Sequence, residues 1–249
     1  MVWLDELQRI LDNPDEPDQL LIVAPPGHAK SSYISEALPA WFLGRHPDRG
    51  VLHVTSTDDM AGIYHAVIES TLRDPDMAAT ESRAYRHRRA FPETAVGDVW
   101  GFEKGLKLAT AKEKVSYKMV GYGASILGLR ADMIILDDPL TEKVAFSDVD
   151  LPKAKQYFKR TLWTRKKPGR KFVVILTRWH FDDFAAELVE RYKFRVIHMP
   201  ALGYWEGDRT CVPRDCTCAC GDMEGGALWS DYIPKDQLVG DREAMLDDD

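Results

Sequence analysis

Several features are scarce in this 249-residue chain, and each absence excludes a class of protein. No apolar run approaches the roughly 20 residues that a membrane-spanning helix needs, and the acidic start Met1–Glu6 lacks the basic region of a secretory signal. The net charge of −7 excludes a wholly basic nucleic-acid binder, although local basic patches remain possible partners for phosphate. With 45% hydrophobic and 29% charged residues, a folded, cytosolic protein is expected.

Short apolar runs alternate with amphipathic segments, which predicts an α/β fold with a mostly parallel sheet and helices on both faces. Residues 74–105 are expected to form a loop-rich insertion. After Pro200 the sequence is rich in Gly, Asp, Cys and Trp and has no comparable apolar runs. We therefore expect an α/β core over 1–200 and a lid or linker over 201–249. Strands are predicted at Leu20–Ala24, Val51–Thr55, Leu106–Ala109, Tyr117–Val120, Met133–Leu136, Phe172–Leu176 and Phe194–Met199, and helices at Ser31–Leu43, Asp59–Leu72, Leu151–Trp163 and Asp182–Arg191.

A loop of small residues joins the first predicted strand to the first predicted helix. Such a loop and the helix N-terminus direct backbone N–H groups at phosphates. Lys30 would reach the β- and γ-phosphates, and the Ser31 hydroxyl would bind Mg²⁺. The strict pattern G-x-x-x-x-G-K-[ST] is not met, because Ala24 and Ala29 replace its glycines. The alternative is an ordinary turn with a surface lysine. The predicted nucleotide contacts are Pro26, Gly27, His28, Ala29, Lys30, Ser31 and Ser32.

A pair of carboxylates follows the strand Met133–Leu136, at the strand end where ligands bind in open α/β sheets. Asp137 would hold Mg²⁺ together with Ser31, and Asp138 would orient the attacking water. Many such enzymes use a longer glutamate for this second role. The alternative for Asp138 is a helix cap. The loop at Lys30 and the two aspartates together predict a P-loop NTPase, with ATP and Mg²⁺ as ligands.

Five segments, in the same order along the chain, resemble the large subunits of phage terminases, the ATPases that package double-stranded DNA. The Thr-Arg-Trp-His run within Leu176–Asp183 is the most specific of them. The others are the phosphate loop Ala24–Ser31, the glycine-bearing segment Gly121–Asp132, the Asp-Asp-Pro at Leu136–Pro139 and the Leu-Trp at Ala227–Ser230.

This resemblance implies a P-loop ATPase domain of the RecA/ASCE-like kind, which would drive viral DNA into a procapsid in the host cytoplasm. The implied partners are double-stranded DNA, a portal protein, a small terminase subunit and further copies of the chain in a ring, a pentamer by family resemblance. Thr177 would couple hydrolysis to DNA grip, with a helix cap as its alternative. Arg130 is the candidate arginine finger for a neighbouring subunit, with an intrachain ion pair as its alternative. Gln8 is the candidate reader of adenine, with a solvated helix position as its alternative. Arg178 would pair with acids or with phosphates, with a structural ion pair as its alternative.

The sequence also departs from the family pattern. Gly27 stands where the family has a loop arginine, and no nuclease domain follows Ser230, so no nuclease activity is expected from this chain. Two other functions stay open. One is another RecA-like motor or helicase, and the other is a nucleotide-binding regulatory or DNA-binding module that does not turn over ATP.

All four cysteines lie close together, and two segments are rich in basic residues. Thiolate clusters favour zinc, but the spacing is unlike paired C-x-x-C, so a structural Zn²⁺ and free thiols both remain open. The basic segments Arg83–Arg89 and Arg165–Lys171 are candidates for a DNA-facing surface, with a solvated surface as the alternative. The cysteines are Cys211, Cys216, Cys218 and Cys220.

Overall fold

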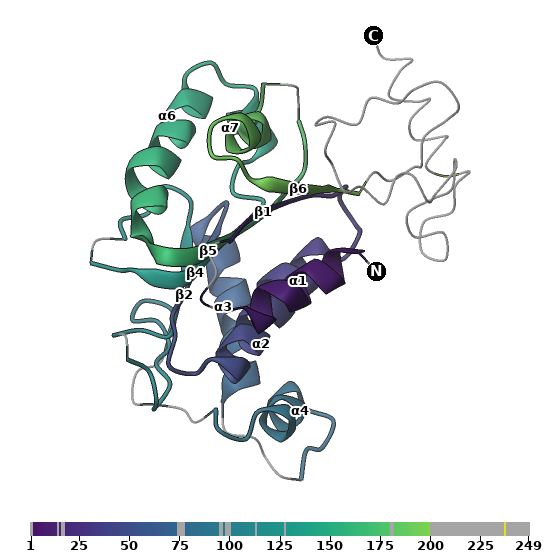
Figure 1. Cartoon of the computed structure of the whole chain (residues 1–249), viewed down its shortest axis with the longest axis vertical. Coiled ribbons are helices and arrows are strands. Elements are labelled where there is room, and N and C mark those ends of the chain that lie inside the picture. Colours follow the sequence, from purple (N-terminus) through teal and green to yellow (C-terminus); the bar gives the residue numbers. More distant parts are fainter. Residues whose placement is uncertain are drawn as a thin grey trace.

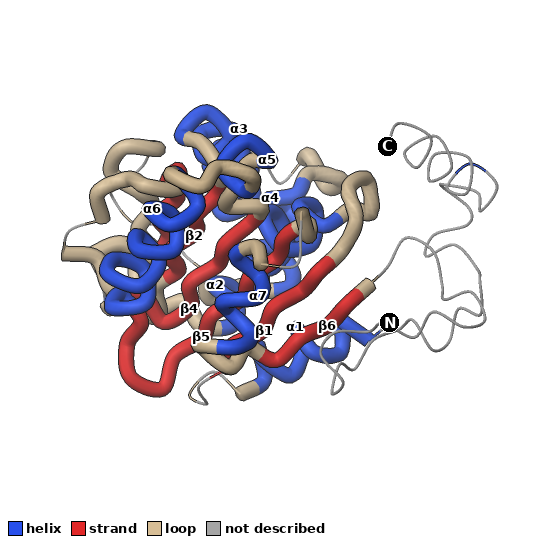
Figure 2. The backbone as a smooth tube through the Cα atoms, turned by 90° about the horizontal axis from the view of Figure 1, so that it is seen from above, coloured by secondary structure: helices blue, strands red, loops and turns tan. Residues whose placement is uncertain are grey.

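A sheet forms the centre of the fold (Figure 2). It has six strands, and all of its strand pairs are parallel. The computed structural model describes residues 2–13, 15, 18–73, 78–94, 97, 101–112, 114–126, 128–179, 182–199 and 237. The strand order is β3-β2-β4-β5-β1-β6. The strands are β1 Asp18–Val23, β2 Val51–Thr55, β3 Tyr117–Gly121, β4 Ala131–Asp137, β5 Lys166–Leu176 and β6 Arg195–His198.

Helices cover both faces of this sheet, as the sequence predicts (Figure 1). The helices α1, α2 and α3 lie on one face, and α6 and α7 lie on the other. Two π-helical turns, η1 Ser32–Ala37 and η2 Phe158–Leu162, continue into or out of α-helices, and a 3₁₀ turn η3 spans Trp163–Arg165. The helices are α1 Val2–Asp12, α2 Leu38–Arg45, α3 Asp58–Leu72, α4 Arg83–Ala90, α5 Glu142–Ala145, α6 Asp150–Tyr157 and α7 Phe184–Glu190.

The alternation of side chains along each strand divides the core in two. In β1, Leu20 and Ile22 pack with α1, α2 and α3, whereas Leu21 and Val23 pack with α6 and α7. Both faces of the sheet are therefore apolar, which explains why its strands are continuous hydrophobic runs rather than alternating ones.

Most predicted elements are confirmed, and two expectations need correction. Leu106–Ala109 forms no continuous strand: Leu106 makes an isolated antiparallel bridge to Tyr117, and Leu108 is a second single bridge residue. The expected loop-rich insertion contains the helix α4, which begins after Ser82, whose side chain accepts a hydrogen bond from the Tyr85 N–H. The proposed lid or linker lies outside the described residues except for Gln237. Within the described part of the chain, no helix is long and apolar enough to cross a membrane.

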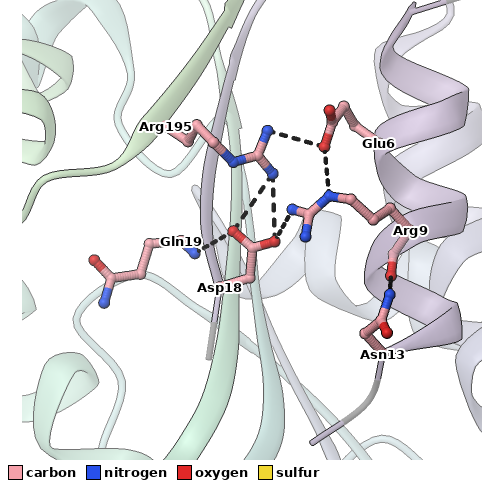
Figure 3. Close-up of polar contacts among 6 residues, drawn as sticks. All are labelled: Glu6, Arg9, Asn13, Asp18, Gln19 and Arg195. Atoms are coloured by element: carbon pink, nitrogen blue, oxygen red, sulfur yellow. Dashed lines mark hydrogen bonds and ion pairs between the residues drawn. The ribbon is translucent and has the colours of Figure 1, made fainter. Parts of the chain in front are cut away.

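A charged network fastens α1 to the amino ends of β1 and β6 (Figure 3). Arg9 of α1 pairs with Glu6 at 3.0 Å and with Asp18. Arg195 of β6 reaches the same two acids, with its nitrogens 2.9 Å from Glu6 and 3.3 Å from Asp18. The network lies at the amino edge of the sheet, away from the candidate site at the carboxyl edge.

Candidate functional site

The site lies where β1, β5 and β4 end side by side at the carboxyl edge of the sheet. Val23 of β1 is in register with Leu176 of β5, and Asp137 of β4 is in register with Ile175. The chain leaves β1 toward α2 on one face and leaves β5 toward α7 on the other. Divergence of this kind opens a crevice at the carboxyl ends of neighbouring strands, which is the usual ligand site of open α/β sheets.

The loop after β1 has a backbone shape that exposes N–H groups. Gly27 and Ala29 both adopt left-handed conformations, with φ of 74° and 55°. Helical backbone begins at Lys30 and passes at once into the π-helical turn η1. Left-handed residues before a helix N-terminus create a concavity that suits an anion. Ala29 thus takes the conformation for which the loop pattern prefers glycine.

Three side chains from separate segments meet at this crevice. The Lys30 ammonium lies 2.7 Å from Asp138 Oδ2 and donates to Thr177 Oγ1 at 2.6 Å. Asp138 Oδ1 in turn accepts the Thr177 backbone N–H at 2.8 Å. Lys30 is buried, at 7% exposure. The three residues that the sequence assigns to phosphate binding, water activation and coupling are therefore in direct contact.

Only one of the two carboxylate oxygens of Asp137 accepts a hydrogen bond from the described residues. Its Oδ2 accepts a hydrogen bond from the Ser35 hydroxyl, while its Oδ1 is buried and accepts none from the described residues. Burial raises the pKa of Asp137, and the Asp138 carboxylate adds to this, whereas Ser35, Ser31 and Lys30 lower it. Ser31 is thus near Asp137 without meeting hydrogen-bond geometry at Oδ1.

These residues fit the requirements of a magnesium ion. An unpartnered, buried carboxylate oxygen is costly unless a cation or donor satisfies it, and Asp137 Oδ1 is such an atom, on a carboxylate whose pKa the nearby Ser31 hydroxyl lowers. Mg²⁺ typically takes one or two protein ligands and completes its shell with substrate phosphates and water. In the described part of the chain, no group of three or more His, Cys, Asp or Glu side chains is arranged to hold a metal ion.

Sequence reasoning missed four residues that surround Asp137. Ser35 of η1 and His53 of β2 are fully buried, and Tyr117 of β3 lies behind His53. Tyr64 of α3 lies near Ser31. Burial raises the pKa of Tyr64, and its interaction with Ser31 lowers it. One signal was available, since a histidine inside the apolar strand Val51–Thr55 is a buried polar group that needs a partner.

Other predicted residues lie elsewhere. Arg130 is exposed and precedes β4, so it lies at the amino edge of the sheet, about 20 Å of strand from Asp137. It is not part of this chain's own site. Gln8 donates to Asp12 of its own helix at 2.8 Å, and its role with adenine stays a prediction. The Arg178 side chain pairs with Asp183 at 2.9 Å. The four cysteines lie outside the described residues.

The two basic segments differ in structure. Arg83 to Arg89 form most of α4, where Arg86 and Arg89 are exposed and Arg83 pairs with Glu36 at 2.6 Å. The second segment contributes to β5. There Lys171 is buried at 1% exposure and Lys167 pairs with Asp132 at 2.8 Å. On α4, Arg86 and Arg89 therefore remain available to an anionic partner.

Comparisons with known proteins add no family assignment. No protein family model matches the sequence, and no curated protein matches it. Fold and site by themselves define the class: a parallel α/β protein with a lysine, two aspartates and a threonine gathered at the carboxyl edge of its sheet.

Proposed function

We propose that the chain is a P-loop ATPase domain that hydrolyses ATP at the crevice between β1, β5 and β4. One observation carries this proposal. Lys30, Asp138 and Thr177 are in mutual contact although Lys30 and Thr177 are 147 residues apart in the sequence. A surface lysine at an ordinary turn would not be buried against a carboxylate and a strand-terminal threonine.

Each residue has a defined part in hydrolysis. The loop N–H groups and Lys30 bind and orient the phosphates, which is most of what catalysis of phosphoryl transfer requires. Asp138 orients a water whose oxygen attacks the γ-phosphorus while the bond to the β-phosphate oxygen breaks. ADP leaves with that oxygen, and the proton of the water passes to Asp138 or to the released phosphate. Asp137 and Ser31 would hold Mg²⁺, which neutralises charge on the phosphate oxygens.

The contacts of Lys30 also suggest how the phosphate is sensed. A γ-phosphate competes with Asp138 and Thr177 for the Lys30 ammonium. Binding of ATP would therefore release both side chains and change the restraint on the end of β5. Thr177 is the first residue after β5 and is followed by Arg178 and its partner Asp183 at the start of α7. This is a direct path from phosphate to a helix on the opposite face of the sheet.

We further propose that this ATPase drives packaging of double-stranded viral DNA, as the motor of a terminase large subunit. The support is the order and content of the segments that resemble that family, above all the Thr-Arg-Trp-His run that begins at Thr177. Portal protein, small terminase subunit and a ring of identical chains are the partners that this role requires.

Steady-state hydrolysis tests the ATPase proposal. We expect Mg²⁺-dependent phosphate release by the wild-type chain, and a loss of about 10²-fold or more in Lys30→Ala and in Asp138→Asn. The exposed pair Lys112–Asp48, 2.6 Å apart, provides matched controls. Lys112→Ala and Asp48→Asn change the same charges and should leave turnover unchanged.

Two outcomes contradict the proposal in different ways. Undiminished turnover in both Lys30→Ala and Asp138→Asn would mean that ATP is hydrolysed at another site. ATP binding without turnover by the isolated chain would mean either a missing ring partner or a regulatory binding module, and no turnover by the assembled ring with double-stranded DNA added would favour the module. Strand separation by the active chain would favour a helicase over a packaging motor.

A further inference from the structure

A buried chain of hydrogen bonds leads from Asp137 into the layer between the sheet and α2 and α3. Ser35 Oγ donates to Asp137 Oδ2. Ser35 Oγ is also 3.2 Å from His53 Nε2, and His53 Nδ1 is 3.0 Å from the Tyr117 hydroxyl. Ser35, His53 and Tyr117 are each 0% exposed, so water does not compete for these bonds.

The sequence places these groups on one face of the sheet for a simple reason. Side chains alternate along strands, and His53 on β2 and Asp137 on β4 both lie on the face that carries α2 and α3. Thr55, two residues after His53, is in register with Asp137. Ser35 is four residues, about one helical turn, after Ser31, so both lie on one face of the helix, and both hydroxyls lower the pKa of Asp137. π-helical turns are frequent at functional sites, where they redirect single side chains.

With Asp137 ionised, as a metal ligand must be, and His53 neutral, one arrangement of protons satisfies the whole series of hydrogen bonds. The single hydroxyl proton of Ser35 goes to Asp137, so Ser35 must accept from His53 Nε2–H. His53 Nδ1 is then the acceptor, and the Tyr117 hydroxyl donates to it rather than to Met119 Sδ at 3.2 Å, because sulfur is the weaker acceptor. Every donor therefore points toward Asp137, which requires a neutral His53. Burial lowers the pKa of His53 to about 3, in agreement with this requirement.

We propose that Ser35 and His53 are positioning residues for the magnesium ligand Asp137. The chain Tyr117–His53–Ser35 occupies Oδ2 and fixes the carboxylate so that Oδ1, the oxygen without a partner, is presented to the metal. This inference rests on the proposed function. It assigns roles to residues that touch neither nucleotide nor metal, comparable with the outer-shell partners that orient ligands in metal sites.

Metal binding measured without turnover tests this assignment. The probe is Mn²⁺ followed by electron paramagnetic resonance in the presence of ADP, with metal-free ADP binding measured separately. We expect Ser35→Ala to weaken Mn²⁺ binding by about 10-fold or more, since loss of an outer-shell partner typically costs 10- to 100-fold. Metal-free ADP binding should be unchanged, because the phosphate loop keeps its contacts. Ser35→Thr retains a hydroxyl and should recover most of the affinity.

A second pair of variants keeps the test decisive if Ser35→Ala is poorly folded. His53→Gln keeps a donor for Ser35 and an acceptor for Tyr117, whereas His53→Leu keeps neither. We therefore expect Mn²⁺ affinity near wild type in the first and several-fold weaker in the second. Ser116→Ala is the control. Ser116 is equally buried, but its hydroxyl accepts a hydrogen bond from the Leu108 N–H and takes no part in the hydrogen bonds from Tyr117 to Asp137.

The outcomes separate this inference from the proposed function. If the wild type binds Mn²⁺ and ADP while Ser35→Ala and His53→Leu bind Mn²⁺ equally well, the positioning role is wrong and the ATPase proposal stands. An equal loss in Ser116→Ala would also overturn it, because the effect would then be general destabilisation. If the wild type binds neither ADP nor Mn²⁺, both proposals fall together.

Discussion

Ala29 shows how a single residue departs from the phosphate-loop pattern while keeping its backbone. Its φ of 55° lies in the left-handed region, where a side chain with Cβ costs about 1–2 kcal/mol. Residues under such strain persist where the surroundings determine them, and they concentrate at functional sites. The neighbours of Ala29 are Lys30, fixed by Asp138 and Thr177, and the turn at Gly27.

Ala29→Gly should therefore stabilise the protein. Relief of the left-handed conformation gains about 1–2 kcal/mol, and the extra freedom of glycine in the unfolded chain costs about 0.4–1 kcal/mol. The net expectation is a gain of about 0.5–1 kcal/mol in the free energy of unfolding by urea titration, with nucleotide binding retained.

The control is the same change at an ordinary position. Ala37, with φ of −82°, lies in right-handed helical backbone, so Ala37→Gly should destabilise by up to about 1 kcal/mol. Equal losses in the two variants would show that Ala29 is not strained.

At the scale of elements, the network of Figure 3 joins the N-terminal helix to the sheet. Asp18 is the central acceptor: its side chain is 9% exposed and it meets Arg9 and Arg195, which are 41% and 39% exposed. Hydrogen bonds to charged groups contribute more than neutral ones, but the exposure of both arginines reduces their contribution.

Asp18→Ala should lower the free energy of unfolding by about 1–3 kcal/mol, because it removes the more buried of the two acids that Arg9 and Arg195 share. Asp48→Ala breaks the exposed pair with Lys112 and should cost less than about 1 kcal/mol. Urea unfolding of both variants provides the comparison. A smaller loss in Asp18→Ala than in Asp48→Ala would mean that the network does not hold α1 in place.

The elements were largely predictable from the sequence, and the reasons are physical. Buried strands of a parallel sheet read as uninterrupted apolar runs, so five of the strands could be placed within a few residues. The segment Leu106–Ala109 has the same local signal but forms only single bridge residues, at Leu106 and Leu108, because sheet pairing is decided by partners distant in the sequence. The helix α4 is polar on all sides and so lacks the apolar periodicity that marks a helix.

The site was predictable only in part. Lys30, Asp137, Asp138 and Thr177 follow strands, and the carboxyl ends of parallel strands share one edge, so their proximity followed from their positions. Ser35 was not identified, because its role depends on the π-helical turn η1 and on the distance to Asp137, neither of which local sequence encodes.

At the scale of the whole molecule, the position of Arg130 decides how it could act. It is exposed at the amino edge of the sheet, at the opposite end of β4 from Asp137. It therefore cannot serve the site of its own chain and would act only on a neighbouring copy in a ring. Such an arginine finger typically contributes about 10³-fold or more to turnover.

Mixing of two inactive variants tests this role. Arg130→Ala should bind ATP normally but lose about 10³-fold in turnover of the assembled ring. Asp138→Asn keeps Arg130 and lacks the catalytic carboxylate. An equal mixture should regain activity, because random assembly gives roughly a quarter of the sites an intact carboxylate and an arginine from the neighbour. No regain, or undiminished turnover in Arg130→Ala alone, would contradict the assignment.

The most direct test of the proposed nucleotide site is calorimetric titration of ATP and Mg²⁺ into the purified chain, because the residues proposed to bind the phosphates all belong to one subunit. We expect saturable binding by the wild type and by Lys112→Ala, and at least a 10-fold loss in Lys30→Ala, whose ammonium would contact the phosphates. Absence of binding by the wild type, or equal affinity in Lys30→Ala, would contradict a nucleotide site at this edge of the sheet.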